Sequence, residues 1–205
     1  MTVPPLPRFA LGDPIPAPTA SDEMRRRLAT RRSAPAQALT GPGPTPREID
    51  DILALGARSP DHGKLFPWRF VVMGPQCRAD LARALAPLAE RQSDPGKAAR
   101  VLSKLTAAPV TILVVSAPVR GATVPRWEQQ LSAGAVGMNL EHAANALGYS
   151  ASWITDWYSY DREATALYGI GEDEQVAGFI HIGHVAERLL ERPRPDVAAL
   201  TTWRD

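Results

Sequence analysis

The chain has 205 residues, of which 44% are hydrophobic, and its formal net charge is +1 at pH 7. That composition supports one sizeable core, and the small net charge gives no overall field that favours nucleic acid or an anionic membrane. Cys77 is the single cysteine, which excludes an intrachain disulfide and a cysteine-rich metal site. The longest apolar stretch, 109–119, is too short to span a bilayer. We therefore expect a cytoplasmic protein with no nucleic-acid partner and no membrane partner.

The first 20 residues predict an extended arm. They lack the apolar run of a signal peptide. Proline disfavours regular helix and favours polyproline-like geometry, and six prolines fall here: Pro4, Pro5, Pro7, Pro14, Pro16 and Pro18. We predict a Pro-rich arm over 1–20 and a single domain over 21–205.

Two helices are predicted next. Ser21 offers an N-cap, followed by first-turn acids, for a helix that reaches about Arg31. After a Gly-Pro loop, Thr45, Pro46 and Glu48 form the start of a second helix with a capping box. Its apolar face is predicted at Ile49, Ile52, Leu53 and Gly56.

The middle of the chain alternates between the two kinds of element. Trp68 to Met73 predicts a strand. Asp94-Pro95 starts a helix that runs to about Leu105, and the β-branched run from Val110 to Ser116 is typical of a strand covered on both faces. Between the first strand and that helix, an apolar stripe at helical spacing includes Cys77, Leu81, Leu85 and Leu88.

A long helix is predicted from about Arg126 to Leu147, with Gly148 as its C-terminal cap. Small residues fill its middle, which places it at the centre of the fold or at a subunit interface. A strand over 150–155, a short helix over 161–168, a strand over 176–183 and a Pro- and Arg-rich tail follow. Because helices and strands mix without strict βαβ alternation, we predict an α+β layered domain.

Two polar segments are candidate binding sites. Arg31-Arg32-Ser33 offers two guanidinium groups and a hydroxyl that suit a phosphate, although arginine at a helix end also compensates the helix dipole. The segment from Asp61 to Lys64 is either a turn or a loop that presents His62 for proton transfer. The two interpretations are compatible, because a turn can also point His62 at a ligand.

Other chemistry finds less support. His181 and His184 suggest a metal site, but no carboxylate cluster completes it, so we predict no metal. The sequence has no Gly-x-Gly-x-x-Gly after a strand, no Gly-Lys-Ser/Thr loop and no Gly-x-Ser-x-Gly elbow. Rossmann, P-loop and hydrolase sites are therefore unsupported.

Five blocks together resemble the FMN-dependent nitroreductase family, in particular its small bacterial NAD(P)H nitroreductases. In chain order they are Arg31 to Ser33, Ala57 to His62 with Pro67 to Phe70, Val124 to Gln129, Ala146 to Tyr149 with Trp153, and Gly178 to Gly183. The resemblance runs in order from about residue 24 to the end of the chain.

The resemblance implies a nitroreductase-like layered fold, with a central mixed or antiparallel sheet flanked by helices. It also implies an interlocked homodimer with FMN at the subunit interface, where each site draws residues from both chains. The cofactor-binding residues that it implies are Arg31, Arg32, Ser33, His62, Phe66, Ser152, Trp153, Ile154, and Arg192 or Arg194 in the tail.

Three positions depart from the family pattern. Phe66 stands where relatives often have Gln, so a hydrogen bond to the flavin edge is lost or replaced by stacking. Ile154 stands where an arginine is expected, and His184 stands where threonine is common. These differences concern flavin polarity and substrate preference.

The implied activity is ping-pong hydride transfer from NAD(P)H through FMN to a small-molecule acceptor such as a nitroaromatic or a quinone. No side chain is implied as catalytic, because the flavin carries the chemistry. A low-turnover flavin-binding sensor or storage protein is the alternative, and a metal-dependent hydrolase that uses the two histidines is a third hypothesis. Trp127 and Trp157 either wall the pocket or pack in a core or an interface.

Overall fold

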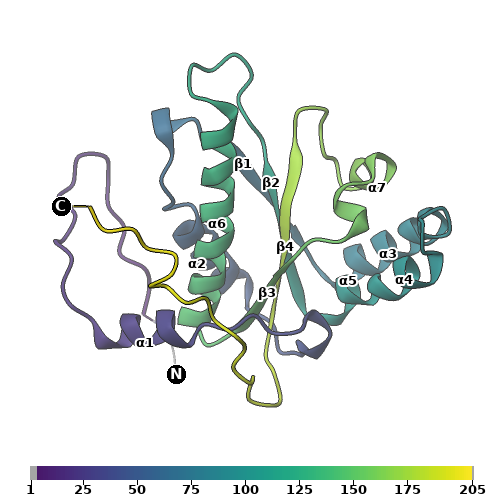
Figure 1. The fold of residues 1–205 in the computed structure, drawn as a ribbon, viewed down its shortest axis with the longest axis horizontal. Coiled ribbons are helices and arrows are strands. Elements are labelled where there is room, and N and C mark those ends of the chain that lie inside the picture. Colours follow the sequence, from purple (N-terminus) through teal and green to yellow (C-terminus); the bar gives the residue numbers. More distant parts are fainter. Residues whose placement is uncertain (1–3, 205) are drawn as a thin grey trace.

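A computed structural model describes residues 4–204, and its centre is a four-stranded antiparallel sheet (Figure 1). The strands are β1 (Trp68–Met73), β2 (Val110–Ser116), β3 (Ser150–Ile154) and β4 (Gln175–Gly183). Their order across the sheet is β1-β2-β4-β3, so β1 and β3 form the two edges. The predicted α+β class is confirmed, and the sheet is antiparallel throughout the described residues.

Both faces of the sheet are covered, as the β-branched run in β2 predicts. Ile112 and Val114 belong to a buried cluster on one face, whereas Leu113 and Val115 belong to a cluster on the other. Successive side chains of a strand point to opposite faces, so a strand between two helical layers carries apolar side chains on both faces.

One face is covered by α2 (Pro46–Gly56) and the long helix α6 (Arg126–Ala146). The predicted capping box is present, because Thr45 accepts from the backbone of Glu48 and Glu48 accepts from the backbone of Thr45. Gly56 lets the two helices approach closely, since a Cβ there would lie 2.4 Å from Leu140 Cδ2. Trp153 reaches α6 from the sheet edge and lies over Gly137.

The other face is covered by α3 (Pro75–Ala89), α4 (Pro95–Val101), α5 (Ser103–Ala107) and α7 (Arg162–Ala166). Two expectations are wrong here. The helix predicted from Asp94 to Leu105 is two helices that meet at Leu102. Cys77 is exposed, whereas Arg78 beside it is fully buried.

Arg78 is buried because its guanidinium satisfies three backbone carbonyls. It donates to Met73 O at 3.2 Å, Leu105 O at 2.7 Å and Pro109 O at 2.9 Å. These bonds tie α3 to the end of α5 and to the start of β2. An apolar periodicity could not reveal this role, because it assigns arginine to the surface.

Three short 3-10 helices complete the fold: η1 (Ala36–Ala38), η2 (His62–Lys64) and η3 (Trp157–Ser159). α1 (Asp22–Thr30) begins at the predicted cap Ser21 and buries none of its residues. Within residues 4–204, no helix has the length and apolarity needed to cross a membrane.

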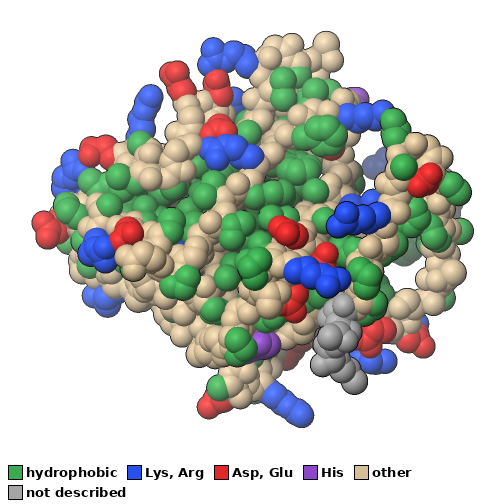
Figure 2. Space-filling view, turned by 180° about the vertical axis from the view of Figure 1, so that it is seen from behind, with side chains coloured by type: hydrophobic (Ala, Val, Ile, Leu, Met, Phe, Trp, Pro, Cys, Tyr) green, Lys and Arg blue, Asp and Glu red, His purple; other side chains and the backbone are tan. Residues whose placement is uncertain are grey.

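The N-terminal arm and the C-terminal tail lie at one end of the molecule, beyond α6 (Figure 1). In the space-filling view from behind, this end stands off the rest of the protein (Figure 2). Both segments expose large apolar side chains, among them Leu11, Ile15, Leu200 and Trp203. These apolar side chains lie outside the three buried clusters of the core.

Candidate functional site

A depression of about 360 Å³ at the outer edge of β3 brings together six of the predicted cofactor-binding residues. They come from three distant parts of the chain, and they are Arg32, Ser33, Ser152, Trp153, Ile154 and Arg192. The sequence places these residues up to 160 positions apart, and the sheet edge is where they meet.

The segment after α1 lies along β3. Ala34 N donates to Ala151 O at 3.0 Å, which attaches the segment to the free edge of the strand. Arg32 Nη1 donates to Ser33 O at 2.6 Å, and Arg32 Nε donates to Leu190 O at 3.2 Å. The tail is therefore held across the same segment, which explains how Arg192 reaches the depression.

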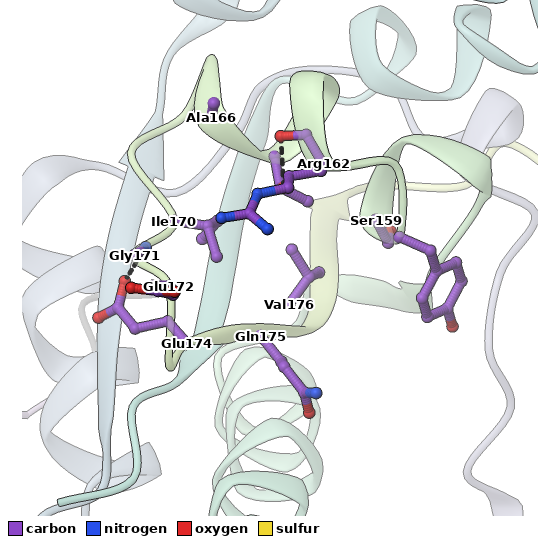
Figure 3. Close-up of a pocket in the computed structure, with 11 residues that line it drawn as sticks. Ser159, Arg162, Ala166, Ile170, Gly171, Glu172, Glu174, Gln175 and Val176 are labelled. Atoms are coloured by element: carbon purple, nitrogen blue, oxygen red, sulfur yellow. Dashed lines mark hydrogen bonds between the residues drawn. The ribbon is translucent and has the colours of Figure 1, made fainter. Parts of the chain in front are cut away.

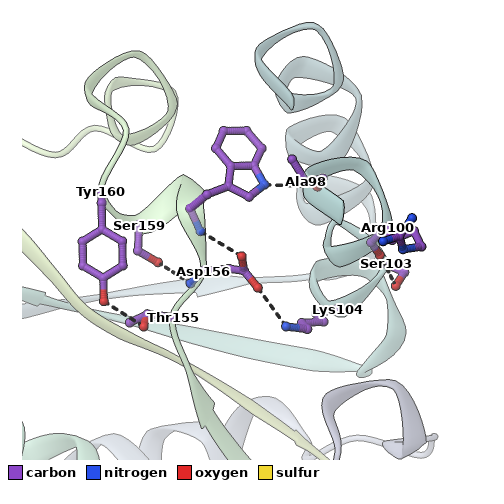
Figure 4. A network of polar contacts seen from close by, with 9 residues as sticks. Ala98, Arg100, Ser103, Lys104, Thr155, Asp156, Ser159 and Tyr160 are labelled. Carbon is purple, nitrogen blue, oxygen red and sulfur yellow. Dashed lines mark hydrogen bonds and ion pairs between the residues drawn. The ribbon is translucent and has the colours of Figure 1, made fainter. Parts of the chain in front are cut away.

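The depression carries positive charge. Of the described residues that line it, Arg32, Lys104 and Arg192 are cations and none is acidic. Lys104 comes from α5 and pairs with Asp156 at 2.8 Å. Figure 4 shows that Asp156 also caps the turn after β3, where it accepts from Trp157 N at 2.9 Å. Arg32 and Arg192 have no carboxylate partner within residues 4–204, so their charge is available to an anion.

An aromatic wall closes one side. Trp153 Nε1 donates to Ala177 O at 3.0 Å, and its ring lies over the backbone of Gly178 and of Gly137. A Cβ at Gly178 would lie 1.9 Å from Trp153 Nε1, so glycine is required for this ring position. The indole is thus fixed between the sheet and α6.

Arg31 does not line this depression. Its Nη1 donates to Glu141 Oε2 and to Ser33 Oγ, both at 3.1 Å. Glu141 is buried on α6; burial raises the pKa of its carboxyl group, and the charge of Arg31 only partly offsets that effect. Arg194 also lies outside, where it donates to Arg31 O and to Glu191. Arg31 thus ties the segment after α1 to α6.

His62 and Phe66 belong to a second group at the start of α6. His62 Nδ1 lies 2.7 Å from Glu128 Oε2, and Asp61 Oδ2 accepts from Phe66 N at 2.8 Å. Gly63, Lys64 and Phe66 adopt positive φ angles of 80°, 55° and 48°, and the Phe66 side chain is 64% exposed. The predicted turn is present, and it presents both side chains outward.

Within one chain, the two groups are far apart. Glu128 contacts His62 in the loop and Glu141 contacts Arg31, and both glutamates lie on α6. Thirteen residues of α-helix span about 20 Å at 1.5 Å per residue. In one copy of the chain, the His62 loop and the depression at β3 are therefore separate.

The two histidines of the metal hypothesis have different partners. His181 is fully buried and its Nδ1 lies 2.7 Å from Thr111 Oγ1, whereas His184 packs against Tyr149 with ring centroids 4.9 Å apart. Among residues 4–204, no three His, Cys, Asp or Glu side chains group as metal ligands. The geometry therefore gives no support to a metal-dependent hydrolase.

A larger depression of about 540 Å³ lies between α7 and the start of β4 (Figure 3). Its charged side chains are Arg162, Glu172 and Glu174, and none of the predicted cofactor-binding residues lines it. Glu174 already pairs with Arg69 at 2.6 Å. Its mixed charges suit an anionic cofactor less well than the depression at β3.

The sequence alone did not place Lys104 at the depression or Glu128 beside His62. Lys104 lies on a five-residue helix, and no spacing indicates that its ammonium group reaches β3. Glu128 belongs to the block from Val124 to Gln129 that supported the resemblance. The sequence therefore drew attention to this block but assigned no role to Glu128.

Comparisons with known proteins agree with this fold. Residues 28–184 match the model of the nitroreductase family. Two curated relatives, YdjA of Escherichia coli (strain K12) and a protein of Haemophilus influenzae, both bear the name "Putative NAD(P)H nitroreductase". The first is 32% identical over 157 residues, which cover 76% of this chain and 85% of YdjA. The second is 32% identical over 163 residues, which cover 78% and 88%.

Solved structures share the architecture. A nitroreductase-like protein from Bacillus cereus matches with a TM-score of 0.78 at 18% identity, over 92% of this chain and 100% of that one. A Bacteroides fragilis nitroreductase solved with bound FMN matches with a TM-score of 0.71 at 19% identity, over 90% and 100% of the two chains. These similarities establish the fold.

Proposed function

Because the chain belongs to the nitroreductase family, we propose that it is an NAD(P)H-dependent FMN oxidoreductase. Its acceptor would be a nitroaromatic, a quinone or a similar flat molecule. The observation that carries the proposal is the depression at the edge of β3, where cations, hydroxyl groups and an indole wall converge.

The residues present fit FMN. Arg32 and Arg192 supply charge for a phosphate, and the hydroxyl groups of Ser33 and Ser152 suit a polyhydroxyl chain. Trp153, which packs on the α6 face of β3, adds an aromatic ring, and Ile154 adds an apolar side chain on the other face. Bound there, FMN would supply the chemistry of accepting a hydride from NAD(P)H and passing electrons onward.

The protein's own part is to bind and orient. Arg31 holds the Ser33 hydroxyl, and the bond from Ala34 to Ala151 holds the segment against the sheet. A cofactor held on one side leaves a single open side for the electron donor and then for the acceptor. That arrangement predicts ping-pong kinetics, with one substrate leaving before the next one binds.

A second copy of the chain would complete the site. The outward face of α6 carries Trp127 and Leu131, which are 67% and 54% exposed, and continues through Met138 and His142. The arm and the tail extend beyond this face (Figure 1). An exposed apolar stripe flanked by two extended segments fits the interface of an interlocked homodimer.

Two-fold symmetry would bring the His62 loop of one copy to the depression of the other. The midpoint of the stripe from Trp127 to His142 falls between Gly134 and Ala135, where small side chains permit close approach. If two α6 helices cross antiparallel there, residue 128 of one helix faces residue 141 of the other. The His62 loop of one copy then lies beside the Arg31 segment and the depression of its partner.

Purification followed by anaerobic titration tests the proposal. A yellow protein whose colour bleaches with NADH or NADPH, and returns with a quinone or a nitroaromatic, is the expected result. A yellow protein that neither nicotinamide bleaches would favour the sensor or storage alternative. A colourless protein that does not take up added FMN would overturn the assignment.

A further inference from the structure

The contact between His62 and Glu128 gives the block from Pro125 to Gln129 a chemical role. His62 Nδ1 lies 2.7 Å from Glu128 Oε2. Since an ionised carboxylate only accepts hydrogen bonds, it keeps a proton on Nδ1. The other nitrogen, Nε2, is then the atom that the ring offers to a ligand.

The loop that carries His62 has an imposed shape. Lys64 and Phe66 adopt left-handed φ angles, which side chains other than glycine rarely occupy and which concentrate at functional sites. Asp61 holds Phe66 N at 2.8 Å, and Ser132 Oγ donates to Pro60 O at 2.7 Å. The first bond holds the shape of the loop and the second fixes the loop to α6, so the ring position follows from this geometry.

Three other charged groups near the loop, Asp61, Arg120 and Arg126, are already engaged. Asp61 accepts from the backbone of Phe66. On the segments that pack against the loop, Arg120 pairs with the Asp173 carboxylate and Arg126 donates to Asp173 O at 2.9 Å. Lys64 makes no ion pair within the described part of the chain. Glu128 is the charged group that contacts the imidazole.

We propose that Glu128 is a positioning residue that holds the His62 ring with Nδ1 toward itself and Nε2 toward the flavin in the second copy's depression, and so favours the reduced flavin. This inference rests on the proposed function and its dimer. Reduction adds hydrogen to the flavin ring system, and an Nε2 lone pair held toward the ring would accept a hydrogen bond that the oxidised flavin cannot donate.

The test compares flavin midpoint potentials at pH 7 in the holoprotein, using wild type, Glu128→Leu and His62→Gln. In each variant we expect the ratio of the affinities for reduced and oxidised flavin to fall about tenfold, which lowers a two-electron potential by about 30 mV. The double variant should fall no further. In flavin-free protein, ¹⁵N spectra should show the His62 proton on Nδ1 in wild type and shared between both nitrogens in Glu128→Leu.

Glu163→Leu is the matched control, because Glu163 is an exposed acid paired with Arg91 on the opposite layer, and it should shift nothing. An unchanged or higher potential in Glu128→Leu, or an unchanged His62 tautomer, would overturn the inference. If Glu128→Leu does not fold, His62→Gln provides the test, because the His62 side chain is 67% exposed and its replacement should not disturb the fold. An unchanged midpoint potential in His62→Gln would also overturn the inference. If the proposed function itself is wrong, the wild-type protein will bind no FMN or its flavin will not be reduced. That result differs from every outcome that overturns the inference.

Discussion

The Arg31 guanidinium lies 3.1 Å from the Glu141 carboxylate, with side chains that are 25% and 4% exposed respectively. This ion pair joins the segment after α1 to the long helix α6. Arg31 thus ties this segment to α6, while Arg32 lines the depression at β3. Neighbouring arginines in one motif have different tasks.

Arg31→Met should destabilise the fold by about 3 kcal/mol at pH 7.5, because it leaves a buried carboxylate unpaired. Burial raises the pKa of Glu141, so the folded state binds a proton before the unfolded chain does as the pH falls. The loss should therefore shrink between pH 7.5 and pH 5. Urea unfolding at both pH values measures it. Arg25→Met, on the exposed Asp22 pair, is the control and should change little.

Arg192→Gln should weaken FMN binding by about tenfold to a hundredfold, since a charged hydrogen bond contributes about 1.5–3 kcal/mol. Riboflavin lacks the phosphate, so its affinity should hardly change. Fluorescence titration of both ligands makes the comparison. Arg194→Gln is the control, because Arg194 pairs with Glu191 outside the depression. Equal losses for both ligands would argue against a phosphate at Arg192.

Gly178→Ala should destabilise the protein by about 1–3 kcal/mol, because the new methyl group overlaps the Trp153 indole. Moving the indole breaks its bond to Ala177 O and opens the wall of the depression. We expect weaker FMN binding as well as a lower urea midpoint. Gly74→Ala, at the start of α3 in the other layer, is the control, since a Cβ there would meet nothing within 4 Å.

Ala135→Arg should convert the proposed dimer to a monomer, because it places a charge at the centre of the α6 crossing. Since each site needs both copies, FMN affinity should fall together with dimerisation. Light scattering after gel filtration reports the mass. Ala86→Arg, at an exposed position on α3 in the other layer, should leave the mass unchanged. A monomeric wild type would contradict this prediction at once.

His181 should make stability depend on pH. Burial, reinforced by the charges of Arg78 and Lys104, lowers its pKa to about 3. The unfolded chain protonates near pH 6.5 and the folded protein does not, so stability falls as the pH drops from about 6.5 toward 3. The slope is about 1.4 kcal/mol per pH unit. Urea unfolding at pH 7 and pH 4.5 should show a smaller difference in His181→Gln, and an equal difference would contradict this account.

Local sequence patterns predicted most elements well. The helix expected from Arg126 to Leu147 spans Arg126 to Ala146, and the β-branched run gave β2 with its bounds. Both signals are contained within a single segment. The break at Leu102 and the burial of Arg78 were missed because they depend on contacts with β2 and α5 that no local period encodes.

The candidate site was harder to predict for the same reason. The motif from Arg31 to Ser33 indicated an anion site, but which arginine faces it depends on Glu141, 110 residues later. Lys104 enters through the network around Asp156 (Figure 4). The sequence identified candidate chemical groups, and the three-dimensional packing determined which of them lie at the depression and which lie at the His62 loop.

The bond from Ala34 to Ala151 has a consequence for solution behaviour. β3 is an edge strand, and an uncovered edge offers free backbone groups to the strands of other molecules. The segment that lies along this edge is also the one that would hold FMN. Loss of the cofactor would loosen that cover, so the apoprotein should self-associate on storage and refilling with FMN should suppress the aggregation.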